Sequence, residues 1–331
     1  MSQTDQRVQD DFPALTDPYR RELLAHCYRM LGSVHDAEDL VQETYLRAWR
    51  SYSSFEGRSS LRTWLYRIAT NVCLTALDGK DRRPLPTGLG APSSAPEAPL
   101  VEGAEVPWLE PMPDGMVGAD ASDPAEIVTS RESIRLAFIA TLQHLPPRQR
   151  AVLILRDVLK WRAAEVAEAL GTTTIAVNST LQRARAQLQQ AALTPDSIVE
   201  PTAPEQRELL DRYVNAFWEK DIATIVEMFT RDAVWEMPPF TGWYQGPANI
   251  GRLIGGQCPG GSHDMRMVET RANGQPAFGL YMRGAEGAFW PFHLQVLTLG
   301  PAGISHVAAF FAPHLFATFG LPASLPAVVT G

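Results

Sequence analysis

A proline-rich, acidic segment divides this chain, and any fold has to accommodate it. Residues 85–130 contain eight Asp and Glu residues and no Lys or Arg, and eight prolines lie between residues 85 and 124. Proline fixes φ and removes a backbone N–H donor, so such a segment forms neither a continuous helix nor a central strand. We therefore expect a linker over residues 85–130 with folded blocks on both sides, which suits a length of 331 residues.

The net charge of the chain is −8, but the charge is unevenly distributed. Residues 131–190 contain nine basic residues against four acidic ones, and residues 12–84 contain eleven against nine. The acidic excess lies largely in the linker. Because the blocks on either side are mildly basic, the net charge does not exclude binding to nucleic acid.

Neither membrane insertion nor a metal or disulfide framework is expected. No apolar run approaches the roughly 18 to 20 residues that span a bilayer, and the amino terminus lacks the basic and apolar stretches of a signal peptide. Cys27, Cys73 and Cys258 are widely spaced and form no CxxC pair. We expect a cytoplasmic protein with no membrane contact, no metal and no cofactor.

Apolar periodicity predicts helices at residues 12–84 and 131–193, on either side of the linker. A proline-containing joint at residues 201–204 then precedes a block over residues 205–318. Its expected helices, residues 205–219 and 222–229, are followed by β-rich stretches between Gly-rich turns, at residues 233–237, 265–271, 277–282, 289–299 and 304–311. The predicted architecture is multidomain, with two all-α helical domains followed by an α+β domain.

The first block contains an amphipathic helix over residues 35–50. Its apolar side is expected to consist of Leu40, Val41, Leu46 and Trp49. The opposite side is acidic without lysine, which suits a basic partner, although a plain solvated face is equally compatible with this composition. The next helix has Ser59 or Ser60 as its N-cap and buries Trp64. It is followed by a basic cluster that suits phosphates, namely Lys80, Arg82 and Arg83.

In the second block, Leu170 and Gly171 end one helix and a threonine caps the next, which is the spacing of a helix-turn-helix. The second helix is expected to bury Ile175 or Val177. Its polar side chains could hydrogen-bond to base edges or phosphates in a major groove, and they are Thr174, Asn178, Gln182 and Arg185. A generic helical hairpin is the structural alternative.

The motifs DAEDLVQE (36–43) and FEGRSSLRTWLYRIATN (55–71) resemble region two of the extracytoplasmic-function group of sigma-70-type factors, and residues 145–188 resemble region four. The resemblance implies that the acidic helix binds the β′ clamp helices of core RNA polymerase through Asp36, Asp39, Gln42 and Glu43. The minus-ten element would be held by Phe55, Arg62, Arg67, Asn71, Lys80, Arg82 and Arg83. The β flap of the polymerase and the minus-thirty-five element would meet region four, the DNA through Arg148, Arg150, Arg162, Thr174, Asn178, Gln182, Arg183 and Arg185.

The third block resembles the SnoaL-like superfamily, in which a curved sheet and helices form a cone around an apolar pocket. Pocket candidates are Trp235, Met237, Trp243, Tyr244, Phe278, Trp290, His293 and His306. In an enzyme, Asp232, His293 or His306 would serve as acid or base beside a carbonyl substrate, with Tyr244 as a hydrogen-bond donor. The structural alternative is that the aromatic residues form the core and that the histidines are satisfied structural groups.

Some factors of this group contain such a domain, which is held to regulate the sigma regions in cis. The linker segment VPWLEPMPD resembles a segment of those relatives, and Trp108 with Leu109 would anchor it. The resulting hypothesis is a non-catalytic alternative sigma factor that binds promoter DNA. One alternative is a SnoaL-like enzyme or ligand sensor, binding a small molecule, fused to a DNA-binding module. Another is a repressor that never contacts polymerase.

Overall fold

The computed structural model describes residues 12–116, 133–190 and 203–327. The chain forms two compact units, each built from two stretches of sequence: residues 1–83 with 109–194, and residues 84–108 with 195–331. Both helical blocks thus belong to the first unit, and the described linker is divided between the two. The predicted linker from 117 to 130, the limits of the second block at 131–132 and 191–193, and the joint at 201–202 lie outside the described residues.

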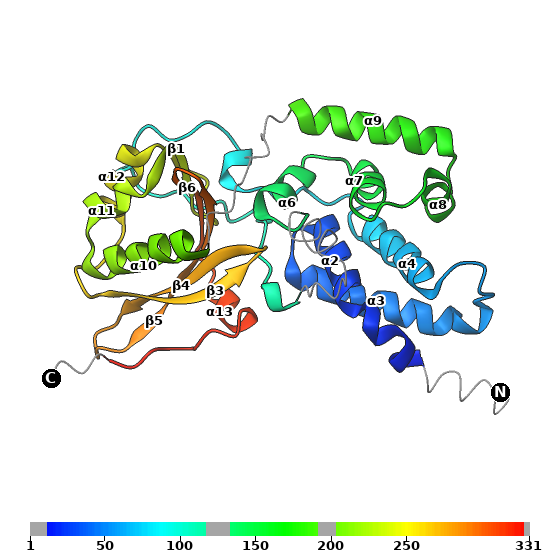
Figure 1. The fold of residues 1–331 in the computed structure, drawn as a ribbon, viewed down its shortest axis with the longest axis horizontal. Coiled ribbons are helices and arrows are strands. Elements are labelled where there is room, and N and C mark those ends of the chain that lie inside the picture. The colour runs from blue at the N-terminus through cyan, green and yellow to red at the C-terminus, as the bar shows by residue number, and fades with distance from the viewer. Residues whose placement is uncertain (1–11, 117–132, 191–202, 328–331) are drawn as a thin grey trace. The chain divides into compact units, whose positions relative to one another are not determined.

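The first unit is helical (Figure 1), as the apolar periodicity predicts. Its first block forms α2 (Arg20–Leu31), α3 (Val34–Ser51) and α4 (Leu61–Ala76), and the linker end contains a short turn, η4 (Asp114–Met116). The second block forms α6 (Leu136–Leu142), α7 (Pro147–Leu153), the π-helical turn η5 (Ile154–Val158), α8 (Ala163–Ala169) and α9 (Thr174–Gln190).

Serine caps define where α3 and α4 begin. The hydroxyl of Ser33 accepts a hydrogen bond from the backbone N–H of Asp36, and that of Ser60 accepts one from Thr63. Each cap satisfies one of the backbone N–H groups that a helix leaves without a partner at its start. The predicted start of α4 is therefore confirmed at Ser60.

The predicted apolar side of α3 is wrong in part. The helix buries Val34, Ala37, Val41, Thr44 and Ala48, whereas Leu46 is 49% exposed and Trp49 is 44% exposed. At 100° per residue, Leu46 lies about 140° from Val41 and Trp49 about 80° from it, so Leu46 falls outside the buried stripe and Trp49 lies at its margin. Two large apolar side chains remain on the outer surface of the helix.

The second unit is α+β, and the predicted class is confirmed. Its described elements are η3 (Pro86–Gly88), α10 (Ala203–Glu219), α11 (Ile222–Glu227), β1 (Phe229–Glu236), β2 (Trp243–Gln245), α12 (Pro247–Gln257), β3 (Met265–Ala272), β4 (Gln275–Arg283), β5 (Phe289–Gly300), β6 (Gly303–Phe310) and α13 (His314–Thr318). The sheet order is β2-β1-β6-β5-β4-β3, in which β1 pairs with β6 in parallel and the other pairs are antiparallel.

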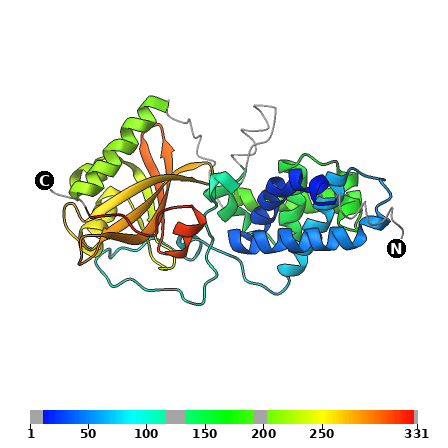
Figure 2. The same ribbon diagram turned by 90° about the horizontal axis from the view of Figure 1, so that it is seen from below.

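The curved sheet packs its concave face against α10, α11 and α12 (Figures 1 and 2). Tyr213 and Phe217 of α10, Trp235 of β1 and Phe278 of β4 belong to this core. This is the cone of sheet and helices expected from the SnoaL-like resemblance. The sequence analysis missed β2 and α12, and α12 was obscured because its 11 residues include three glycines, which disfavour helix.

Within the described ranges, no helix is both long enough and apolar enough to cross a bilayer. The same residues contain no cluster of three or more histidine, cysteine or acidic side chains that could hold a metal ion.

Two buried histidines make the stability of the chain depend on pH. Burial, with a smaller contribution from Arg29, lowers the pKa of His26 from 6.5 to about 3, and burial lowers the pKa of His293 to about 3. The unfolded chain therefore binds more protons below pH 6.5. Each histidine should cost about 2 kcal/mol of unfolding free energy between pH 6.5 and 5. Denaturant unfolding across this range measures the loss, and His293→Gln should flatten the slope for the second unit, whereas an unchanged slope contradicts this account.

Candidate functional site

The outer surface of α3 combines acidic and apolar side chains. Asp39 is exposed and lies 3.9 Å from the Nε2 atom of His35, while Glu43 pairs with Arg47 at 2.7 Å. We call this region the α3 outer surface and define it as Asp39, Gln42, Glu43, Leu46 and Trp49. Carboxylates beside exposed apolar side chains suit a partner that is both basic and apolar.

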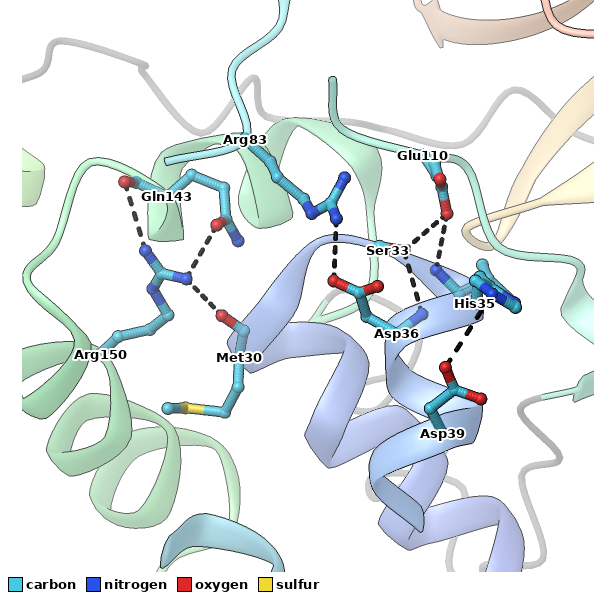
Figure 3. A network of polar contacts seen from close by, with 10 residues as sticks. Met30, Ser33, His35, Asp36, Asp39, Arg83, Glu110, Gln143 and Arg150 are labelled. Carbon is cyan, nitrogen blue, oxygen red and sulfur yellow. Dashed lines mark hydrogen bonds and ion pairs between the residues drawn. The ribbon is translucent and has the colours of Figure 1, made fainter. Parts of the chain in front are cut away.

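Asp36, the remaining residue predicted to bind core polymerase, is already engaged within the first unit. Its carboxylate accepts a hydrogen bond from Arg83 at 2.8 Å (Figure 3). Arg82, the preceding residue, donates to the Nδ1 atom of His144 at 2.8 Å. Two of the three basic residues that were expected to meet DNA phosphates are therefore held by protein groups.

The linker end that belongs to the first unit is fixed at the start of α3. The Oε2 atom of Glu110 accepts hydrogen bonds from the Ser33 hydroxyl at 2.8 Å and from the Val34 N–H at 3.0 Å (Figure 3). The Glu110 N–H donates to the carbonyl of Gly32, and the Tyr28 hydroxyl donates to the Glu110 carbonyl. A carboxylate is favourable here because the first N–H groups of a helix lack partners and have partial positive charge.

Two apolar side chains of the same linker segment are fully buried. Leu109 and Met112 each have no exposed area, and a Cβ atom added to Gly32 would lie 2.7 Å from Leu109. Gly32 has a φ of 71°, so its backbone conformation also favours glycine. Leu109 therefore packs inside the first unit, and its role as an anchor stays a prediction.

The predicted minus-ten residues line α4 and the loop before it. Phe55 packs on Trp64 with ring centroids 4.8 Å apart, and Arg62 pairs with Glu22 and lies over the ring of Tyr66 at 5.0 Å. Lys80 is exposed. Phe55 and Arg62 thus both make contacts within the protein.

Helix α8 of the second block contacts the side of α4 that was expected to face DNA. Arg67 lies 3.6 Å from the carboxylate of Glu168, and the Asn71 amide donates to the carbonyl of Ala169 at 3.5 Å. The ring of Tyr66 meets that of Trp161 at 6.0 Å. In this arrangement, side chains expected to capture the minus-ten strand contact region-four residues.

The helix-turn-helix spacing is confirmed between α8 and α9. Gly171 has a φ of 61°, and the Thr173 hydroxyl accepts a hydrogen bond from the Ala176 N–H as the cap of α9. Val177 is fully buried, whereas Ile175 is 81% exposed, so the alternative left open by the sequence is decided for Val177. Thr174, Asn178 and Gln182 are exposed.

The basic residues predicted to contact the minus-thirty-five element lie in different environments. Arg148 is exposed, Arg162 pairs with Glu165 at 2.9 Å, and Arg183 donates to the Thr180 hydroxyl at 3.2 Å. Arg185 forms a two-point pair with Asp157 of η5, at 2.6 and 2.9 Å. The guanidinium of Arg185 is thus directed toward η5.

The prediction for Arg150 requires a correction, because this side chain is only 3% exposed. Its guanidinium donates to the carbonyls of Met30 and Gln143 and to the Gln143 amide oxygen (Figure 3). It also donates to the carbonyl of Leu145. Burial lowers its pKa to about 10. In this structure Arg150 joins α7 to α2 and presents no group to a DNA phosphate.

Linker residues 84–108 form a strap along the second unit, which we call the linker strap. The Thr87 N–H donates to Glu236 at 2.9 Å, and Glu97 makes a two-point pair with Arg252 of α12 at 2.6 and 2.8 Å. Trp243 donates to the carbonyl of Gly90 at 2.9 Å. An acidic, proline-rich segment is thus held chiefly through its backbone groups.

Near its end, the linker strap is tightly packed. The Gly103 N–H donates to the carbonyl of Pro239, and a Cβ atom added to Gly103 would lie 2.9 Å from Thr241 and 3.0 Å from Trp108. The indole N–H of Trp108 donates to the Gly103 carbonyl at 3.2 Å. The predicted anchors Trp108 and Leu109 therefore belong to different units, although they are adjacent in sequence.

The eight pocket candidates do not converge on one site. Trp235 is a core residue and Trp290 is 56% exposed. His293 accepts from the Gln295 amide at 2.8 Å, and the Gln295 oxygen accepts from Tyr213 of α10. His306 pairs with the buried Glu236 at 2.7 Å.

The two histidines face opposite sides of the sheet. The contact between Gln295 and Tyr213 places Gln295 on the concave face, and His293, two residues earlier, shares that face. His306 lies opposite Thr298 in the sheet, three residues from Gln295, and therefore on the other face. The two imidazoles cannot act together as an acid and a base. Tyr244 is buried and Trp243 is tied to the linker strap.

A groove of about 360 Å³ lies between α10 and β3, and of the predicted pocket residues only Phe278 lines it. Its lining is mixed, with polar side chains at its rim and apolar ones deeper, and consists of Arg207, Leu210, Asp211, Val214, Asn215, Met267, Glu269 and Phe278. Arg207 and Glu269 pair at 2.7 Å across it.

Comparisons with known proteins identify the family. The Sigma-70 region 2 model matches residues 15–83, and the Sigma-70, region 4 model matches residues 135–188. The ECF RNA polymerase sigma factor SigG of Mycobacterium tuberculosis (strain ATCC 25618 / H37Rv) is 61% identical over 95% of this chain and 85% of its own length. The chain belongs to the extracytoplasmic-function family of RNA polymerase sigma factors.

A second relative of this sigma factor is SigJ of the same strain, which is 30% identical over 81% of this chain and 80% of its own length. The crystal structure of M. tuberculosis SigJ covers 93% of this chain and 99% of its own, with a TM-score of 0.61 and 23% identity. That likeness supports the fold, in which helical sigma regions precede an α+β domain.

The family membership establishes the main function. The protein is an alternative sigma factor, a non-catalytic transcription factor that recognises promoters together with core RNA polymerase. Sequence analysis missed two contributors to its surfaces, the exposed pair Leu46 and Trp49 and the linker residue Glu110. Glu110 lay within the quoted segment VPWLEPMPD, but nothing in the linker sequence indicated that it would meet the start of α3.

Proposed function

We propose that this sigma factor is held in a resting state by its own linker and carboxyl-terminal domain. In the cytoplasm it would bind the β′ clamp helices of core polymerase through Asp36 and the α3 outer surface. It would capture the melted minus-ten strand through α4 and the loop before it. Region four would meet the β flap and read the minus-thirty-five element through α9.

The observation that carries this proposal is that the residues flanking the linker strap on both sides contact the start of α3 within the first unit. Arg83, directly before the strap, pairs with Asp36, and Glu110, shortly after it, caps the same helix. A polymerase helix that uses Asp36 must displace Arg83. Displacement of the linker strap is therefore transmitted through the chain to α3, the proposed core-binding helix.

Packing between the two sigma regions supports the same interpretation. Arg67 and Asn71 meet α8, and Arg150 of α7 donates to the backbone of α2. A single-stranded element that uses Arg67 and Asn71 requires α8 to move away. Opening of the first unit would thus precede promoter capture.

The carboxyl-terminal domain is assigned a regulatory role and no chemical step. Two of its three candidate acid–base groups, His293 and His306, lie on opposite faces of the sheet. A small molecule that acts on this domain would bind as an effector and leave unchanged.

Forcing the linker strap off the second unit should raise transcription. In Gly103→Val, the new side chain meets Thr241, Trp108 and Val106, each within 3.1 Å of the added Cβ atom, so the strap must shift. We expect several-fold more promoter-specific transcript in run-off assays with the full chain and purified core polymerase on genomic fragments.

The matched control is Gly90→Val in the same strap, because a Cβ atom added to Gly90 meets nothing within 4 Å. It should leave transcript levels close to those of the unaltered chain. Equal output from all three proteins contradicts regulation through the strap. No promoter-specific transcript from any of them contradicts the initiation function on this template set.

A further inference from the structure

Ile175 is the most exposed large apolar side chain in the described part of the chain, at 81%. It lies in the first turn of α9, the second helix of the helix-turn-helix. Single exposed apolar residues are common on proteins. The position of this one at the start of a recognition helix gives it a specific consequence.

The fold fixes the direction in which Ile175 points. Val177, Leu181 and Ala184 of α9 are buried, so the opposite side of the helix faces solvent. Ile175, Ser179 and Gln182 are spaced four and three residues apart and form one exposed stripe at the middle of that side. Arg185 does not share the stripe, since it turns to Asp157.

The stripe suits the major groove of DNA. Recognition helices present the residues near their amino terminus to base edges, where thymine offers the C5-methyl group for apolar contact and the other edge groups are hydrogen-bond donors and acceptors. Ile175 is surrounded on α9 by Thr174, Asn178 and Ser179, which can hydrogen-bond to such groups.

We propose that Ile175 determines specificity by packing against a thymine methyl group in the minus-thirty-five element. The inference rests on region four reading that element. A protein partner fits less well, because the exposed neighbours of Ile175 on α9 are polar and an apolar interface core needs several large side chains.

Selection of promoters provides the first test. The full chain and its Ile175→Ala variant are each combined with core polymerase and used to select duplexes randomised over both promoter elements. The unaltered chain should enrich thymine at one or more minus-thirty-five positions, and the variant should lose that preference at one of them. The variant should remain folded, because Ile175 makes little contact with the rest of the unit.

Replacing that thymine with deoxyuridine removes only the methyl group and provides the decisive measurement. The unaltered holoenzyme should bind the uridine promoter about three- to fivefold more weakly, the value of burying one methyl group. Ile175→Ala should bind both promoters equally. Ile175→Val, which retains part of the apolar contact, should show an intermediate ratio.

Two outcomes would overturn the assignment: an unchanged thymine preference in Ile175→Ala, or equal binding of thymine and uridine promoters by the unaltered chain. In either case promoter-dependent selection still succeeds, so the initiation function stands. If neither protein enriches any minus-thirty-five sequence, region four does not read DNA there, and both the assignment and its premise fail.

Discussion

Replacing Trp49 with alanine should weaken binding to core RNA polymerase by about thirtyfold, or about 2 kcal/mol, the loss typical of a truncated interface anchor. Trp49 is 44% exposed beside Leu46 at 49%. Both lie on the same surface as Asp39 and Glu43, so the carboxylates can orient a basic partner while the apolar side chains are covered by it. Titration of labelled chain with core polymerase measures the change.

The matched control is Trp290→Ala, because Trp290 is similarly exposed, at 56%, but lies on β5 of the other unit. It should leave core affinity within about twofold, as surface substitutions outside an interface do. Charge reversal at Asp39 should weaken binding as well and should reduce its sensitivity to salt. Equal affinities of Trp49→Ala and Trp290→Ala for core polymerase would contradict the assignment of α3 as the core-binding helix.

Local signals in the sequence were sufficient to predict the elements whose conformation depends on residues within a few positions. The cap at Ser60, the turn at Gly171 and the β-rich stretches of the third block rest on residue preferences within a few positions. The family motifs in the two helical blocks added the identity of both sigma regions. These expectations agree with the structure because no distant contact overrides them.

Interactions between distant segments could not be predicted in this way. Arg150 is one of several arginines in a basic block, and only the contact of α7 with α2 distinguishes it from the exposed Arg148. The sides of the sheet occupied by His293 and His306 depend on strand register, which the sequence does not reveal. The linker is uniform in composition, and its division between the two units at Trp108 and Leu109 also depends on contacts with distant segments, so nothing in the sequence indicated it.

Arg150→Met should lower the unfolding free energy of the first unit by on the order of 3 kcal/mol, because it leaves buried acceptors without their charged donor. These acceptors are the carbonyls of Met30, Gln143 and Leu145 and the amide oxygen of Gln143. Methionine fills a similar volume, so the loss reports hydrogen bonding more than packing. Denaturant unfolding measures it, with the helical first unit followed through the loss of helical circular dichroism.

Arg148→Met is the matched control two residues away. Arg150→Met should lower stability, whereas Arg148→Met should leave stability nearly unchanged. Arg148 is exposed, so its loss should change stability by less than about 0.5 kcal/mol. If Arg148 contacts a promoter phosphate, its loss should reduce the steepness of the plot of log affinity for promoter DNA against log salt concentration by about one. An Arg150→Met protein with unaltered stability but a reduced salt dependence would reverse the assignment and make Arg150 a DNA contact that becomes exposed when the first unit opens.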